Sequence, residues 1–250
     1  MTTPDHDLFS PIAQQYRQFR PHYPADLFAY LASITPGREC AWDCGTGNGQ
    51  AAVGLADYFQ QVVATDISAQ QISLAFVNPK VRYQVAAAEN CGLPASSVNL
   101  VTVGEALHWF DLDRFGHEVA RVLQPGGKLA VWNYRRCRIT PALDRIVDVF
   151  HDEILAGHWA VAARKDDVFT HELPLIDTAT PAFTIVAEWS LDSFKGYLGS
   201  WSACNSYKEK HGHSPLDLIT SDLEKHWPIL GGRMRVSWQL NLRVGAVSGS

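Results

Sequence analysis

Apolar runs and amphipathic stretches alternate between residues 39 and 134. Short apolar runs are typical of buried strands, and a stripe repeated every three to four residues is typical of a helix. Leu112, Phe115, Val119 and Val122 form such a stripe, and the turn-forming segment 124–127 (Gln-Pro-Gly-Gly) ends it. Five strands are predicted, at 39–42, 61–65, 81–85, 98–103 and 128–132. Regular alternation of this kind predicts a parallel sheet with right-handed crossovers.

The flanking segments follow another rhythm. Residues 8–35 form an N-terminal helical element with Phe9, Ile12, Tyr16 and Phe19 at helical spacing, which Pro21 and Pro24 interrupt. Residues 141–164 form a helical stretch with no strand partner, so we expect an insertion over the open end of the sheet. Two more strands are predicted at 183–190 and 236–244, and helices at 192–203 and 215–226.

The pattern therefore predicts one domain over residues 1–250. Its fold class is α/β: a seven-stranded, mostly parallel, Rossmann-like doubly wound sheet with helices on both faces and a helical lid or insertion. Its parts are a lid at 8–35, a ligand-binding core at 36–135, cap helices within 136–180 and 192–230, and the last two strands.

Composition narrows the class of protein. With 250 residues and 46% hydrophobic content, the chain can bury a full core. A net charge of -5 argues against binding nucleic acid through its phosphates. Five cysteines without a C-x-x-C pair favour a reducing cytoplasm. A polar N-terminus and the lack of a long apolar run predict a protein that is neither exported nor embedded in a membrane.

A glycine-rich turn carries the candidate chemistry. Residues 42–49 read Trp-Asp-Cys-Gly-Thr-Gly-Asn-Gly, between a strand and a helix, and Asp66 follows 23 residues after Asp43 at the end of the next strand. Glycine lets backbone N–H groups approach a ligand, and the second carboxylate suits ribose hydroxyls. The spacing G-x-G-x-G differs from the dinucleotide pattern G-x-G-x-x-G. Asp43 would repel a diphosphate but suit an ammonium, as in S-adenosylmethionine.

Four further motifs accompany this turn, and together they resemble a class I S-adenosylmethionine-dependent methyltransferase. They are Asp66 after the second strand, 87–89 (Ala-Ala-Glu), 105–110 (Glu-Ala-Leu-His-Trp-Phe) and 121–127 (Arg-Val-Leu-Gln-Pro-Gly-Gly). Segments 16–24 and 200–203 also look like the methyltransferase type 11 group and its trans-aconitate-methyltransferase-like branch. One departure is the small Cys44, where larger aliphatic residues are frequent.

The resemblance implies a set of cofactor contacts. Asp43, Gly45 and Gly47 would lie at the methionine part, Asp66 at the ribose, and Ile67, Ala88 and Glu89 around the adenine. Glu105 would lie beside the sulfonium, and Arg20 and Tyr16 would belong to a closing lid. An amphipathic helix with exposed arginines and buried tyrosines is the alternative for the lid. The cofactor would be S-adenosylmethionine and the product S-adenosylhomocysteine.

The acceptor site is less defined. Tyr23, His108, Trp109 and Trp201 are the candidates for the substrate pocket, although core packing is an alternative for each aromatic residue. A carboxylate acceptor is already ionised, whereas an alcohol or an ammonium must lose a proton. His108 is the candidate base and competes with a positioning role. His211 and His213 lack companions at ligand spacing, so no metal is expected.

The leading hypothesis is methyl transfer to a small-molecule acceptor, with a carboxylate as one candidate. Methylation of RNA or protein and non-catalytic regulation by cofactor binding are the alternatives. We expect no nucleic-acid or membrane partner, and a monomer or homodimer.

Overall fold

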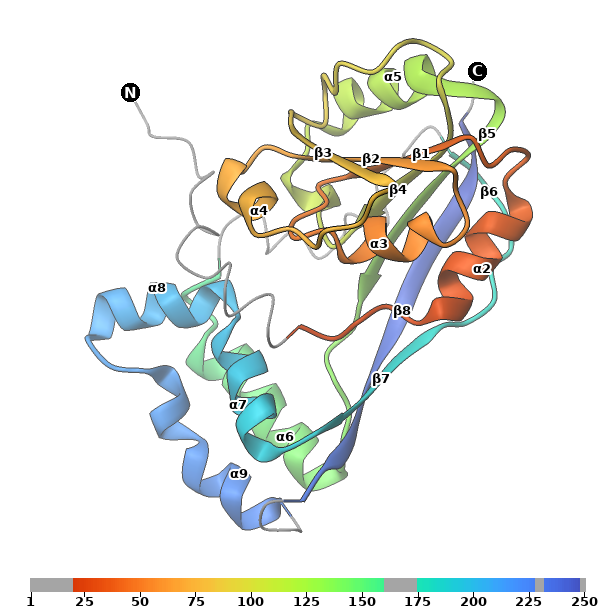
Figure 1. Ribbon diagram of the computed structural model, residues 1–250. Helices are drawn as coiled ribbons and strands as arrows, with labels where there is room; N and C mark the ends of the chain where they lie inside the picture. The colour runs from red at the N-terminus through yellow and green to blue at the C-terminus, as the bar shows by residue number, and fades with distance from the viewer. Residues whose placement is uncertain (1–19, 160–174, 228–231, 248–250) are drawn as a thin grey trace.

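A computed structural model describes residues 20–159, 175–227 and 232–247, and it contains one twisted sheet with helices around it (Figure 1). The strands are β1 (Cys40–Cys44), β2 (Gln61–Asp66), β3 (Val81–Val85), β4 (Val98–Gly104), β5 (Leu123–Tyr134), β6 (Leu175–Asp177), β7 (Thr184–Trp189) and β8 (Met234–Val247). Across the sheet the order is β3-β2-β1-β4-β5-β8-β6, and β7 also pairs with β8. Seven positions across the sheet agree with the predicted count, because β6 and β7 both pair with β8 at its outer edge.

The sheet is mixed, which corrects the prediction of a mostly parallel one. Strands β1 to β5 pair in parallel, whereas β8 is antiparallel to β5, to β6 and to β7. The reason lies in the connection from β7 to β8. Three helices at the carboxyl end of the sheet form this connection, and no helix returns along the sheet. Strand β8 therefore starts where β7 ends and must run in the opposite direction.

Two hydrophobic cores hold the layers together. Helices α2 (Ala25–Ile34) and α3 (Gln50–Ala56) cover one face, with Leu27, Leu31 and Leu55 fully buried. Helix α5 (Leu112–Val122) covers the other face through Phe115 and Val119. Strand β4 is buried along nearly its whole length, as expected for a parallel strand with both faces covered. The doubly wound arrangement follows from these two layers.

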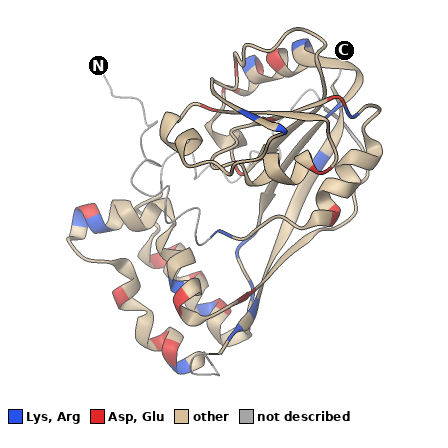
Figure 2. Ribbon diagram, in the orientation of Figure 1, with Lys and Arg blue, Asp and Glu red and all other residues tan. Residues whose placement is uncertain are grey.

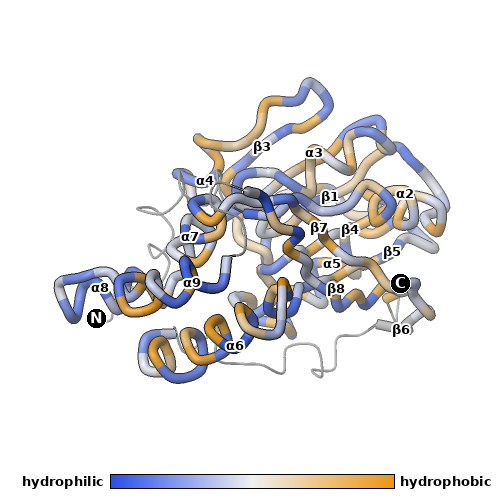
Figure 3. Tube along the Cα trace, turned by 90° about the horizontal axis from the view of Figure 1, so that it is seen from below, coloured by the Kyte–Doolittle hydropathy of each residue, from blue (hydrophilic) through white to orange (hydrophobic). Residues whose placement is uncertain are grey.

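A group of helices lies beyond the carboxyl ends of β5 and β7, and we call it the helical cluster (Figure 1). It comprises α6 (Pro141–Val149), the π-helical turn η4 (Phe150–Ile154), α7 (Leu191–Gly199), α8 (Ser202–His211), the 3-10 helix η6 (Pro215–Leu218) and α9 (Thr220–His226). Apolar and polar positions alternate along α6, as in an amphipathic helix (Figure 3). Acidic and basic residues are interspersed over the cluster (Figure 2). Its buried side chains belong to the same core as those of α2 and α3.

Local signals explain where several of these helices begin. The Asp111 carboxylate accepts a hydrogen bond from the Arg114 N–H at 3.2 Å, and the Thr140 and Ser190 hydroxyls cap α6 and α7 in the same way. Gly212, at φ +78°, ends α8 in the left-handed conformation. The single helix expected at 192–203 is instead two helices, and the one expected at 215–226 divides into η6 and α9.

The predicted N-terminal element is only partly described. Residues 20–35 are described, and their helix α2 packs on the sheet, whereas Tyr16 lies outside the described residues. The predicted helix at 141–164 is seen as far as Ile154. None of the helices described is long and apolar enough to cross a membrane.

Candidate functional site

A cavity of about 410 Å³ opens at the carboxyl ends of β1, β2, β4 and β5. The sheet order reverses between β1 and β4, since β2 and β3 lie on one side of β1 and β4 and β5 on the other. Such a switch point is where open α/β sheets bind ligands. The cavity also has the size of a small-molecule pocket.

The glycine loop between β1 and α3 forms one wall, and its three glycines serve different purposes. All have positive φ, at +66° for Gly45, +56° for Gly47 and +87° for Gly49. A Cβ on Gly45 would lie 2.5 Å from the Ala106 Cβ, and one on Gly49 would lie 2.1 Å from the Tyr83 hydroxyl. A Cβ on Gly47 would meet nothing closer than 4.0 Å. The first and third glycines therefore allow packing, and the middle one leaves its outer side open to a ligand.

Asp43 lies beneath this loop and is 1% exposed. Its two carboxylate oxygens accept hydrogen bonds from the Thr46 hydroxyl at 2.5 Å and from the Thr102 hydroxyl at 2.8 Å. Burial raises its pKa to about 6, although these hydrogen bonds favour the ionised form. Asp43 thus ties the loop to β4, and its carboxylate also lines the cavity wall.

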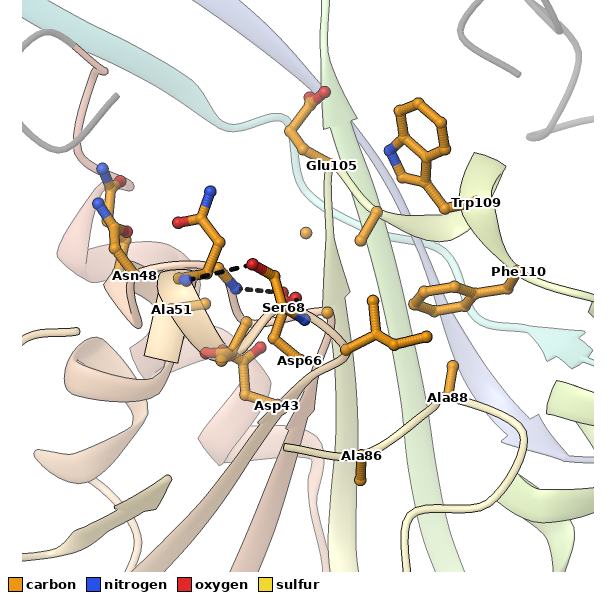
Figure 4. A pocket seen from close by; sticks show the side chains of 18 of the residues that line it. Asp43, Asn48, Ala51, Asp66, Ser68, Ala86, Ala88, Glu105, Trp109 and Phe110 are labelled. Carbon is orange, nitrogen blue, oxygen red and sulfur yellow. Dashed lines mark hydrogen bonds between the residues drawn. The ribbon is translucent and has the colours of Figure 1, made fainter. Parts of the chain in front are cut away.

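Asp66 at the end of β2 faces the loop from the other side. Its oxygens accept the Gly47 N–H at 2.8 Å and the Ser68 N–H at 2.9 Å (Figure 4). Burial raises its pKa, and the backbone donors lower it. Each carboxylate oxygen can accept a second hydrogen bond, so Asp66 can still take two hydroxyl groups of a ligand.

An apolar end of the cavity lies beyond Asp66. Ile67 is 49% exposed and lines this end with Ala86, Ala88 and Phe110. Figure 4 shows Ala86 and Ala88 at the end opposite Glu105. Glu89 accepts the Asp111 N–H at 2.9 Å, which holds its side chain at the start of α5. A flat apolar group would fit between these side chains.

Glu105 lies at the opposite end, immediately after β4. It has φ +59°, a conformation that is strained for a residue with a Cβ. Its Oε1 accepts the Tyr134 N–H at 2.5 Å, and its own N–H donates to the Trp132 carbonyl. Burial raises the pKa of Glu105 to about 7, while the Tyr134 N–H and the Arg20 charge lower it. A carboxyl group of this kind changes protonation state near neutral pH.

Arg20 connects this end of the cavity to the helical cluster. Its Nη1 donates to the Tyr134 hydroxyl at 2.7 Å and its Nη2 to the Ser200 carbonyl at 3.4 Å. The guanidinium also lies 5.7 Å from the centre of the Tyr197 ring. Tyr23 lines the same wall, and its ring lies 5.4 Å from the Trp132 ring. A positive charge is therefore held in place beside Glu105.

The remaining candidates for the substrate pocket divide into two groups. Trp109 lines the cavity, whereas its neighbour His108 is not among the lining residues. Burial lowers the pKa of His108 to about 4, so the ring is neutral and weakly basic. Trp201 is 6% exposed and packs within 6 Å of the Phe150, Tyr197, His151 and Trp159 rings. The structure thus places Trp201 in the core of the helical cluster rather than in the lining of this cavity.

Three polar residues of the cavity wall were not among the predicted site residues. Asn48 is 2% exposed and Gln71 is 5% exposed, and both line the cavity with Gln50. The Asn48 Nδ2, Gln50 Nε2 and Gln71 Oε1 atoms are buried without a hydrogen-bond partner. Buried polar atoms of this kind call for a partner, so a polar ligand suits this wall. The segment Gly-Asn-Gly-Gln was the available signal, because it places two amides directly at the glycine loop.

The other predicted chemistry is simple to describe. His211 stacks on Tyr207 with ring centres 4.2 Å apart, and no group of three metal-ligating side chains occurs among the residues that the structure describes. The five cysteines are free thiols, and all but Cys40 are buried.

Comparisons with known proteins agree with this site. A family model described as a methyltransferase domain matches residues 42–131. A Dictyostelium discoideum protein provisionally named a methyltransferase is 32% identical over 232 residues, covering 90% of this chain and 88% of the relative. A Saccharomyces cerevisiae protein, provisionally named an S-adenosylmethionine-dependent methyltransferase, is 25% identical over 265 residues, covering 89% and 91%. A solved structure from Anaeromyxobacter dehalogenans, provisionally described as a type II methyltransferase, has a TM-score of 0.85 and 38% identity, covering 92% and 98%.

Proposed function

Because this chain belongs to the S-adenosylmethionine-dependent methyltransferases, we propose that it transfers the methyl group of this cofactor to the carboxylate of a small molecule. The cofactor supplies an activated methyl group on a sulfonium and leaves as S-adenosylhomocysteine. The enzyme has to position the acceptor and exclude water, and positioning alone can contribute roughly 7 to 11 kcal/mol.

The residues of the cavity suit each part of the cofactor. We propose that Asp66 accepts the ribose hydroxyls and that Ile67, Ala88 and Glu89 surround the adenine. Asp43, Gly45 and Gly47 would lie at the methionine part, where the open outer side of Gly47 leaves room. The partnerless Asn48 and Gln71 amides on the same wall support a polar ligand here. Glu105 would lie near the sulfonium.

The single observation that carries a carboxylate acceptor is the position of Arg20. Its guanidinium lines the cavity beside Glu105 and is fixed by Tyr134 and Ser200. A guanidinium held in this way is a suitable partner for a carboxylate on the acceptor. The resemblance to the trans-aconitate-methyltransferase-like branch supports the same acceptor class.

A second observation agrees with this acceptor. His108, the base expected from the sequence, is absent from the cavity lining and has a lowered pKa. A carboxylate needs no base, because it is ionised at neutral pH. With the acceptor anchored by Arg20, its oxygen can attack the methyl group while the sulfur takes the electron pair of the breaking bond.

Three wider expectations belong to the same proposal. We expect a small-molecule partner without nucleic acid, a monomer or homodimer, and a cytoplasmic location. The free thiols support a reducing compartment.

A methyl-transfer screen over carboxylic acids, phenols and amines, read by mass spectrometry, tests the acceptor. We expect a carboxylic acid to be methylated. Arg20→Ala should then raise the KM for that acid by tenfold or more, since a hydrogen bond to a charged group contributes about 1.5 to 3 kcal/mol. Arg145→Ala, an exposed position on α6, is the matched control. Methylation of amines or phenols alone, or an unchanged KM in Arg20→Ala, would contradict the proposal.

A further inference from the structure

The two carboxyl oxygens of Glu105 have different surroundings. Oε1 is bound to the Tyr134 N–H at 2.5 Å. For Oε2, no donor is recorded among residues 20–159, 175–227 and 232–247, and the side chain lines the cavity beside Trp109 (Figure 4). The strained backbone at φ +59° holds the carboxyl group in this position. Oε2 is therefore the oxygen that an acceptor molecule can reach.

The charges around Glu105 come from several elements. The charged and titratable side chains that share the cavity with it are Arg20, Tyr23, Asp43, Asp66, Glu89, Asp111, Arg114 and Tyr134. Burial raises the pKa of Glu105 to about 7, and the Tyr134 N–H and Arg20 lower it. A bound carboxylate would raise this pKa and a sulfonium would lower it, so the two influences oppose each other. The protonated form is therefore available near neutral pH.

We infer that protonated Glu105 holds the acceptor carboxylate by donating a hydrogen bond from Oε2, an inference that rests on the carboxylate acceptor proposed above. Two carboxyl groups that share one proton are stable where two carboxylates would repel each other. Arg20 supplies the neighbouring positive charge. One acceptor oxygen is then occupied, and the other remains available for attack on the methyl group.

This arrangement balances without a base. The free acceptor oxygen forms the new O–CH3 bond, the S–CH3 bond breaks, and its electron pair stays on sulfur. The proton remains on Glu105 throughout. The product is a neutral ester, which accepts a weaker hydrogen bond than a carboxylate does. Loss of the acceptor's charge therefore favours release of the product.

A general-base role for Glu105 makes the opposite predictions. A base must be deprotonated, so its activity would rise with pH, and Glu105→Gln would abolish it. A hydrogen-bond donor must be protonated, so binding weakens as the pH rises. Glutamine can replace it, because its Oε1 can accept the Tyr134 N–H while its Nε2 donates to the acceptor.

The experiment measures carboxylate binding by calorimetry to enzyme saturated with S-adenosylhomocysteine, with trans-aconitate, succinate and benzoate as probes. Kd is determined between about pH 6 and pH 9 for wild type, Glu105→Ala, Glu105→Gln and the exposed control Glu188→Gln. Affinity for S-adenosylhomocysteine shows that each variant is folded. Steady-state kinetics with the methylated acid give KM over the same range.

In the wild type and the control, we expect affinity for a bound probe to fall about tenfold for each pH unit above the pKa of Glu105. Glu105→Ala should weaken binding about tenfold or more near pH 6. Glu105→Gln should restore most of that loss and remove the pH dependence. A pH-independent Kd in the wild type, or a glutamine variant as weak as the alanine variant, would overturn the inference while the carboxylate acceptor stands. If no probe binds and only amines or phenols are methylated, the proposed acceptor itself is wrong.

Discussion

Replacing Asp66 tests the part of the site on which cofactor binding depends most. Its oxygens already accept the Gly47 and Ser68 N–H groups, and each can accept one ribose hydroxyl in addition. Hydrogen bonds to a charged group contribute about 1.5 to 3 kcal/mol, and each 1.4 kcal/mol is a tenfold change in affinity. Asp66→Ala should therefore weaken cofactor binding roughly 10-fold to 100-fold.

Isothermal titration with S-adenosylmethionine and with S-adenosylhomocysteine makes this prediction specific. Both molecules carry the same ribose, so Asp66→Ala should weaken both by the same factor. Asp66→Asn should lose less, because its Oδ1 still accepts a hydrogen bond. Asp57→Asn, an exposed position after α3, should bind like the wild type. Unchanged affinity in a folded Asp66→Ala variant would refute the ribose role, and a loss confined to S-adenosylmethionine would place Asp66 at the sulfonium instead.

Three further predictions use other residues of the site. Gly49→Ala should destabilise the fold by about 1 to 3 kcal/mol in urea titrations, because its Cβ would overlap Tyr83, whereas Gly47→Ala should mainly weaken cofactor binding. His108→Asn should leave kcat within about threefold of the wild type, and a loss of about 100-fold or more would establish it as the base. Burial raises the pKa of Glu105 from its ordinary 4.5 to about 7, so its ionisation destabilises the cofactor-free fold as pH rises through that window. Glu105→Gln should therefore gain about 1 to 3 kcal/mol relative to wild type between pH 5 and pH 8, and an equal difference in Tm at both pH values would contradict this.

The strands and the glycine turn could be predicted because their signals are local. An apolar run such as 98–103 has to be buried on both sides, and the structure places β4 there. The direction of β8 has no such signal, since its alternating pattern is the same in either direction. The break between α7 and α8 was missed for a related reason. It falls at Ser200 and Trp201, without a proline, where the hydrogen bond from Arg20 and the burial of Trp201 hold the chain.

The two ends of the cavity differ in how far the sequence could predict them. The cofactor end is built from consecutive residues of the glycine loop and from strand ends, so motif spacing suffices. The acceptor end joins residues far apart in the chain: Arg20 and Tyr134 are separated by 114 positions, and Arg20 and Ser200 by 180. Tyr134 holds Glu105 through its N–H and Arg20 through its hydroxyl, so one residue positions both an acid and a base. Acceptor specificity therefore belongs to this group as a whole, and folding, rather than any local pattern, brings it together.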